Sequence, residues 1–145
     1  MNKISQSILK IHAIFLVILT IALTIAGFVG MNTGMGPFNW LRDIPMALVG
    51  LMQAYLLMLL IGVSLWIGSG GERIWRWSVI AIAAHCIPLL AIFSLWNVLA
   101  AGGYLGIATY SYFIHGTWIT VEAISLGITA RQRGISNAAA IPSRS

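Results

Sequence analysis

Hydrophobic residues form four long runs, separated by short segments rich in Gly, Pro, Asn and charged residues. The runs cover residues 11–30, 45–67, 77–100 and 108–130. Each is close to the ~20 apolar residues that a helix needs to cross the hydrocarbon core of a bilayer. Short connections make consecutive helices antiparallel neighbours. The pattern therefore predicts an all-α membrane protein, an antiparallel four-helix transmembrane bundle. It forms one domain over residues 1–131, and a polar tail over 132–145 is predicted to be disordered.

The composition excludes a soluble globular domain. Hydrophobic residues make up 59% of the 145 residues and charged residues 8%, whereas soluble domains carry about 25% charged residues. The apolar run between Ile11 and Val29 is longer than the ~7–15 residues of the hydrophobic region in a secretory signal peptide. We therefore expect it to be a retained helix.

The basic residues predict the orientation in the membrane. Seven of the eight flank one side of the predicted bundle: Lys3, Lys10, Arg73, Arg76, Arg131, Arg133 and Arg144. The opposite side has only Arg42. Cytoplasmic loops carry the excess of Lys and Arg, so both termini are predicted to be cytoplasmic, in a multi-pass protein of the inner (plasma) membrane. Because the charges are scattered at span boundaries instead of forming a patch, nucleic-acid binding is not expected.

The chain lacks the residues that several kinds of chemistry require. A single cysteine, Cys86, excludes a disulfide within the chain and a CxxC motif. The only lysines, Lys3 and Lys10, lie outside the predicted spans, so no span can carry a Schiff base. The chain also lacks a GxSxG motif and a phosphate-binding loop.

The fourth run carries a polar seam along one helical face. Its members are Ser111, His115, Trp118, Glu122, Ser125 and Thr129. His115 and Glu122 are seven residues apart, which is two helical turns, so they share that face. An ionisable residue within the hydrocarbon costs ~2.5–3.5 kcal/mol on insertion scales and is a functional-site candidate by default. We expect the seam to face the interior of the bundle.

Depth along the helices predicts two polar layers. His85 and Glu122 each lie eight residues from the inner end of their predicted span, ~12 Å into the membrane. His115 lies fifteen residues and Gln53 fourteen residues from the inner ends of their predicted spans. The prediction is an inner layer of His85 with Glu122 and an outer layer of His115 with Gln53. Pro88 leaves the carbonyl of residue 84 without its helical partner, next to His85.

These residues are the candidate site. Glu122, His85 and His115 are the catalytic candidates, and Trp118, Gln53 and Ser111 the substrate-binding candidates. Three interpretations stay open: a structural pairing of buried groups, a pocket for a ligand or substrate, and a path for protons or ions.

A small helical bundle with two histidines in its predicted spans suggests a haem bound between them. His85 and His115 would be the pair, but the predicted depths differ by ~10 Å, whereas the two axial nitrogens of one iron must be level. A haem b with one histidine ligand, or one held between subunits, stays possible. A dedicated metal site would need three or four ligands at one level, and His85 with Glu122 supplies two.

Two segments resemble the styrene oxide isomerase family. Residues 11–16, which include His12, look like the start of its first helix, and residues 42–52, Arg-Asp-Ile-Pro-Met-Ala-Leu-Val-Gly-Leu-Met, look like the entrance of its second. The resemblance implies a small four-helix membrane enzyme, a homo-oligomer and specifically a trimer. In that family a haem iron held between subunits opens an epoxide to an aldehyde. The family's axial histidine falls on Asp43 here and its asparagine on Val49, so its functional residues are not retained.

Two functions from different classes follow. The first is a membrane-embedded isomerase or lyase acting on a hydrophobic small molecule that enters from the lipid bilayer. The second is a non-catalytic accessory or scaffold subunit, whose polar seam would satisfy another chain. An enzyme needs the seam to face its own interior, whereas a subunit needs it to face a partner.

Overall fold

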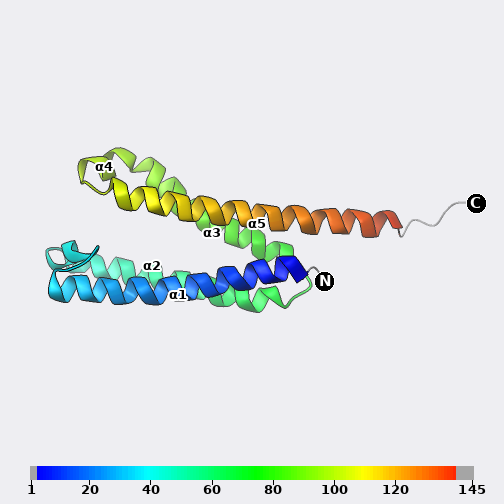
Figure 1. Cartoon of the computed structure of the whole chain (residues 1–145), viewed down its shortest axis with the longest axis horizontal. Helices are drawn as coiled ribbons and strands as arrows, with labels where there is room; N and C mark the ends of the chain where they lie inside the picture. Colours follow the sequence, from blue (N-terminus) through cyan, green and yellow to red (C-terminus); the bar gives the residue numbers. More distant parts are fainter. Residues whose placement is uncertain (1–2, 140–145) are drawn as a thin grey trace, which may run out of the picture. The chain divides into compact units, whose positions relative to one another are not determined.

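The chain folds into helices, as the sequence predicts (Figure 1). The computed structural model describes residues 3–139, and the side chains of residues 3–131. Its elements are α1 (Lys3–Thr33), the 3-10 helix η1 (Asn39–Arg42), α2 (Met46–Ser69), α3 (Ile74–Ser94), α4 (Trp96–Ala101) and α5 (Leu105–Ala139). No strand occurs in this part of the chain, so the all-α prediction is confirmed.

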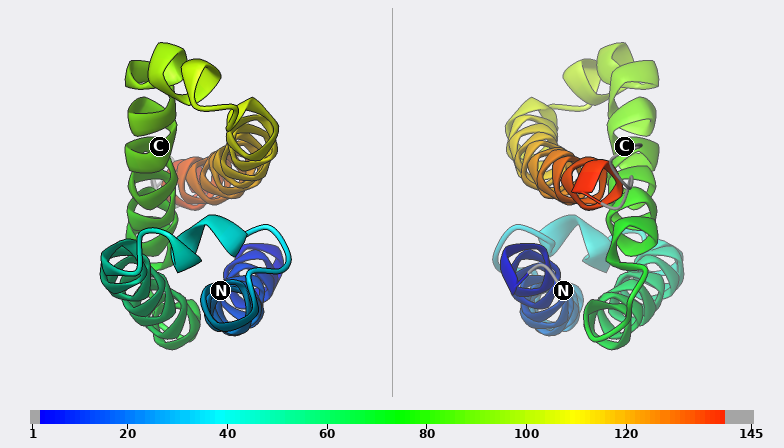
Figure 2. Two further views of the ribbon diagram at one scale, coloured as in Figure 1. Left: turned by 90° about the vertical axis from the view of Figure 1, so that its left-hand side faces the viewer. Right: turned by 90° about the vertical axis from the view of Figure 1, so that its right-hand side faces the viewer.

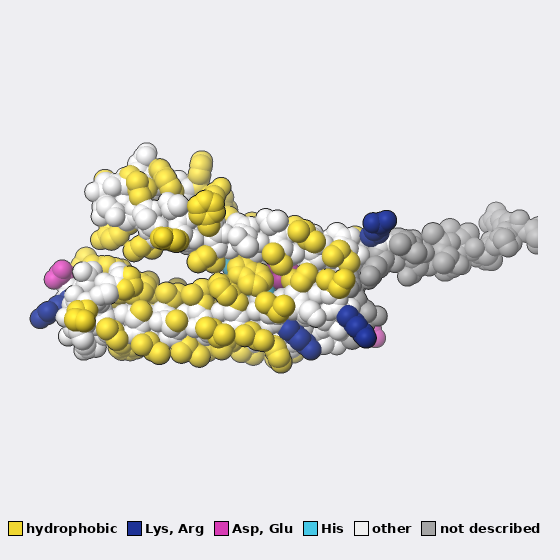
Figure 3. Space-filling model, in the orientation of Figure 1, with side chains coloured by type: hydrophobic (Ala, Val, Ile, Leu, Met, Phe, Trp, Pro, Cys, Tyr) yellow, Lys and Arg dark blue, Asp and Glu magenta, His cyan; other side chains and the backbone are white. Residues whose placement is uncertain are grey.

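Three helices, α1, α2 and α3, are long and apolar enough to cross a membrane. Large hydrophobic side chains remain exposed along them, as expected where lipid takes the place of water. In the space-filling view, hydrophobic side chains cover much of the visible face of α1, and most of the Lys and Arg side chains in view lie toward the helix ends (Figure 3). The protein is therefore a membrane protein. α5 is the least apolar of the long helices and is not among these three.

Two predicted boundaries are wrong. The predicted run 77–100 is two helices, because the backbone at Leu95 leaves the helical conformation (φ −104°, ψ 11°) between α3 and α4. The residues on both sides of this break are apolar, so hydropathy gives no signal for it. α5 also continues to Ala139, through part of the tail predicted to be disordered. Polarity alone does not end a helix. Residues 140–145 lie outside the described residues.

Glycine turns end two helices as the sequence indicates. Gly34 after α1 has φ +69°, and its N–H donates to the carbonyl of Gly30 at 2.9 Å. After α4, Gly103 has φ +76°, and the N–H of Tyr104 donates to the carbonyl of Leu99 at 2.8 Å. Both are glycine caps that satisfy carbonyls left open at a helix end. The second cap fixes where α5 begins.

The chain divides into two compact units, where one domain was expected. One unit comprises residues 1–9 and 68–145, and the other comprises residues 10–67. Each is described here by itself.

The 10–67 unit is an antiparallel hairpin of α1 and α2, which lie side by side (Figure 1). The facing pairs are Ala13 with Gly62, Thr20 with Tyr55, and Gly27 with Leu48. The numbers rise along α1 as they fall along α2, so the helices are antiparallel. The hydroxyl of Thr20 donates to the carbonyl of Tyr55 at 3.4 Å. At Gly62 the helices approach closely, because an added Cβ would lie 3.2 Å from the carbonyl oxygen of Ala13.

The other unit is built on α3 and α5. These helices pack against each other, run in opposite senses and cross obliquely (Figure 2). The buried positions of α3 are Ile74, Ser78, Ala81 and His85. Their spacing of three and four residues makes one helical face. The first turns of α1 join this unit through Ser5, whose hydroxyl donates to the carbonyl of Ser125 at 3.3 Å and lies 3.0 Å from the hydroxyl of Thr129.

The close approach at Gly62 generates a stability prediction. Gly62→Leu should lower the free energy of unfolding by about 1–3 kcal/mol, because the larger side chain overpacks the α1–α2 contact. Gly50→Leu is the matched control, since no atom lies within 4 Å of a Cβ added at Gly50 on the same helix. Thermal unfolding in detergent measures both. Equal melting temperatures for the two variants would refute the close packing at Gly62.

Candidate functional site

The centre of the candidate site is a direct contact between two histidines. His85 on α3 is 4% exposed, and its Nδ1 lies 2.7 Å from the Nδ1 of His115 on α5. The ring centroids are 5.0 Å apart and the ring planes are tilted by 51°. The packing of α3 on α5 thus brings together two imidazoles that are 30 residues apart in the sequence.

This contact contradicts the predicted separation of the two histidines. His85 and His115 were expected at depths ~10 Å apart, yet the structure places their rings in direct contact; the predicted pairing of His85 with Glu122 stays a prediction. The inner ends of α3 and α5 are not level, so depth counted from them does not compare the two helices: His85 lies eleven residues from Ile74, and His115 lies twenty-four residues from Ala139. Counted from the other ends, His85 is nine residues before the end of α3 and His115 ten residues after the start of α5.

The lower half of the seam faces inward. Glu122 and Ser125 are 0% exposed, and Ser125 and Thr129 carry the hydrogen bonds to Ser5. Thr129 also donates to the carbonyl of Ser125 at 3.0 Å, which satisfies its hydroxyl on its own helix. The inward direction predicted for the seam therefore holds for these residues.

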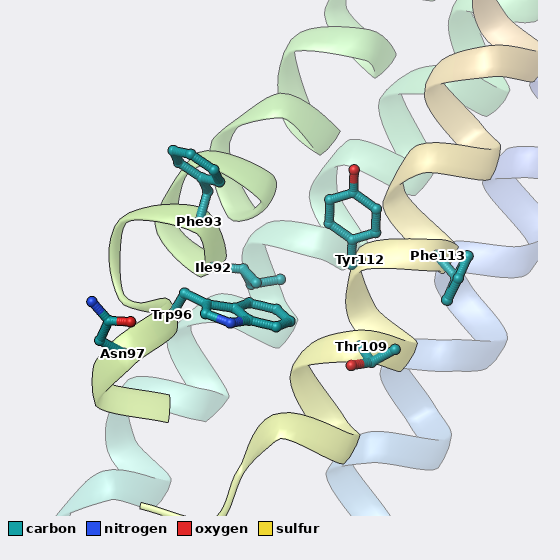
Figure 4. Close-up of a pocket in the computed structure, with 7 residues that line it drawn as sticks. All are labelled: Ile92, Phe93, Trp96, Asn97, Thr109, Tyr112 and Phe113. Carbon is teal, nitrogen blue, oxygen red and sulfur yellow. The ribbon is translucent and has the colours of Figure 1, made fainter. Parts of the chain in front are cut away.

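An open hollow lies between α3, α4 and α5 (Figure 4). Its volume is about 540 Å³, and it is lined by Ile92, Phe93, Trp96, Asn97, Thr109, Tyr112 and Phe113. A second hollow of about 400 Å³ shares Tyr112 and Phe113, and continues along α5 to Gly116, Thr117, Thr120 and Val121. Volumes of ~300–1,000 Å³ with apolar walls and a few polar groups are typical of sites for small molecules. His85 and His115 line neither hollow, although in the sequence His115 lies between Tyr112 of the first hollow and Gly116 of the second.

The sequence analysis missed this hollow. Trp96 and Tyr112 lie near one end of their predicted spans, where aromatic side chains gather at membrane surfaces, and neither was selected as a site residue. The available signal was the spacing of Thr109, Tyr112 and Phe113, three and four residues apart, which puts them on one face of a helix. The break at Leu95 places Trp96 against this face of α5, and the hydropathy gives no sign of that break.

The predicted substrate-binding residues lie elsewhere. Ser111 and Trp118 are half-buried on α5 and line neither hollow. Gln53 is exposed on α2, in the 10–67 unit. Cys86, next to His85 in the sequence, is a free half-buried thiol.

The histidine pair does not fit a haem held between His85 and His115. Two axial nitrogens stand on opposite sides of one iron, about 4 Å apart if each metal–nitrogen bond is ~2 Å. Here the two Nδ1 atoms are within direct hydrogen-bond distance, 2.7 Å, so a porphyrin has no space between them. Among the described residues, no group of three or more His, Cys, Asp or Glu is placed to hold a metal ion.

Comparison with known proteins gives no relative. No protein-family model, no curated protein and no solved structure matches the chain. The resemblance to styrene oxide isomerases therefore stays a prediction from the sequence.

The direct histidine contact has a spectroscopic consequence. If the purified protein, from cells supplied with haem, shows a Soret band, that band should not depend on both rings, because the direct Nδ1–Nδ1 contact prevents His85 and His115 from holding one iron between them. Absorption spectra of His85→Asn and His115→Asn, recorded before and after dithionite, measure this. A stoichiometric band that disappears in both variants would show that the two rings separate to bind iron.

Proposed function

We propose that this protein is a membrane-embedded enzyme of the isomerase or lyase type, in which His85 and His115 move protons on a hydrophobic small molecule. The observation that carries the proposal is the direct contact of two imidazoles on helices that also line an apolar hollow. Imidazole is the most common general acid and base, because its unperturbed pKa allows both roles near neutral pH.

The hollow supplies the binding site in this proposal. It is open, since Phe93 is 79% and Phe113 66% exposed, so a molecule dissolved in lipid reaches it without crossing water. Asn97, Thr109 and Tyr112 are its polar groups. A few such groups in an apolar wall orient a ligand through one or two hydrogen bonds.

We assign Glu122 a structural role within this proposal. It lies seven residues from His115 on α5, ~10 Å along the helix axis. That distance is too long for one small molecule to contact both side chains at the same atom. Glu122 is also fully buried, whereas His115 is half-buried.

The inward seam favours the enzyme over the accessory subunit. A subunit whose seam satisfies another chain would expose Glu122 and Ser125, yet both are buried within the chain. The hydroxyl of Ser5 in the same chain bonds the backbone carbonyl of Ser125 and contacts the hydroxyl of Thr129. Among the described residues the Ser125 hydroxyl has no hydrogen-bond partner, but its burial keeps it out of reach of a second chain.

The membrane arrangement that we propose keeps α5 as a fourth span, with both termini cytoplasmic and the protein in the inner membrane. Two cation–π contacts support this orientation: Lys10 lies 5.7 Å from the Trp66 ring and Arg76 5.5 Å from the Trp75 ring. Basic residues with tryptophans mark the cytoplasmic interface. The homo-oligomer, specifically a trimer, rests on the family resemblance alone.

The test is a search for turnover that depends on His115. Proteoliposomes are incubated with a lipid-soluble metabolite extract in heavy water, and untargeted mass spectrometry follows isomers of equal mass, deuterium uptake and lyase fragments. We expect His115→Asn to lower the rate by about 10²–10⁴-fold, since it removes a general acid–base group. Glu122→Gln is the control and should keep the rate within a few-fold. If no metabolite changes with the wild type, the accessory-subunit alternative replaces this proposal.

A further inference from the structure

We infer that His85 and His115 share one proton between their Nδ1 atoms and divide the work: His115 is the catalytic residue, and His85 is a positioning residue that stores the proton. The shared proton follows from geometry alone. The division of roles rests on the proposed function.

The distance between the nitrogens requires a shared proton. A neutral imidazole has one N–H and one bare nitrogen. Two bare Nδ1 atoms would repel at 2.7 Å, and two Nδ1–H groups would clash, so one of the two carries hydrogen and the other accepts it. If His85 donates, the hydrogen of neutral His115 is on Nε2. If His115 donates, its Nε2 is bare and can act as a base.

The two histidines differ in their surroundings. His85 is 4% exposed, whereas His115 is only half-buried. Within the described part of the chain, the bond to His85 is the sole hydrogen bond of the His115 ring, whereas His85 has a further interaction. The Nε2 of His115 is thus the nitrogen of the pair that is left for a bound molecule. The His115 ring itself lines neither hollow, so a molecule that reaches it extends beyond the lining residues.

This arrangement supports a proton shift within one molecule. The Nε2 of His115 removes a proton from one substrate atom, and the Nδ1 proton of His115 moves to the Nδ1 of His85. His115 is then neutral with hydrogen on Nε2, and His85 is an imidazolium. His115 next delivers the Nε2 proton to a second substrate atom, while His85 returns the Nδ1 proton. One bond to hydrogen breaks and one forms, with no oxidant, reductant or co-reactant.

The substrate class follows from that balance. The molecule is apolar and has isomers that differ in the position of one hydrogen, with a carbonyl or similar group that acidifies it. A double bond that moves relative to a carbonyl is the simplest example. The carbonyl would take a hydrogen bond from one of the polar groups of the hollow, such as Asn97 or Thr109.

Nitrogen NMR tests the shared proton without a substrate. The full chain, labelled with ¹⁵N-histidine and held in lipid bilayers, should show coupling between two Nδ1 atoms across the hydrogen bond. One of these histidines should carry its hydrogen on Nδ1. His85→Asn and His115→Asn each assign the signals and should abolish the coupling. Two histidines that both carry hydrogen on Nε2, without coupling, would overturn the inference.

Acylation by diethyl pyrocarbonate tests the division of roles. The reagent is small and attacks bare imidazole nitrogen, so the accessible ring reacts first. We expect His115 to be modified at least about tenfold faster than His85, because a buried group reacts only when the structure opens locally. Mass spectrometry of the digested protein gives both rates. Equal rates, or faster modification of His85, would overturn the roles.

Turnover distinguishes this inference from the proposed function. On the reaction found in the metabolite extract, His85→Asn should lower kcat by about 10²-fold and leave KM unchanged. The asparagine amide offers a hydrogen-bonding atom near the Nδ1 position but cannot carry the proton. An unchanged kcat would overturn the storing role of His85 and leave the proposed function in place. Nδ1 coupling without any turnover would overturn the proposed function and leave the shared proton in place.

Discussion

A polar side chain inside lipid has no water to bond, and the architecture of each unit depends on that constraint. The outer faces of the helices are apolar, so hydrophobicity alone does not choose one helix pairing over another. Polar contacts determine which helices pair. His85 joins α3 to α5, Ser5 joins the start of α1 to α5, and the hydroxyl of Thr20 joins α1 to α2. Close approaches at glycine, such as Gly62, add the packing.

The sequence predicted the helices and their turns well, because long apolar runs and glycine are strong local signals. Helix ends were harder. The break at Leu95 lies among apolar residues on both sides, and the extension of α5 to Ala139 runs through polar ones. At Leu95 a helix ends although the hydropathy stays high. After residue 131 the hydropathy falls although α5 continues. Both depend on how the backbone satisfies its own hydrogen bonds, which composition does not record.

The sequence analysis selected the two histidines of the candidate site but did not predict that they contact each other. His85 and His115 were both selected because they are ionisable within apolar helices. Their pairing was missed, since depth was counted from the inner ends of two helices whose ends are not level, and seven residues along a helix amount to ~10 Å. The hollow was missed for a different reason. Trp96 and Tyr112 come from separate helices, and only the tertiary fold brings them together.

The hydrogen bond between the two histidines contributes little to the stability of the fold. Hydrogen bonds between membrane helices contribute on average ~0.6 kcal/mol, and well-packed apolar side chains often replace buried polar pairs without loss. A pair kept only for packing would also gain from burying both rings. Here one ring is buried and the other is half-buried, with its second nitrogen left without a protein partner among the described residues. Packing does not require that asymmetry, whereas a group that exchanges protons with a bound molecule does.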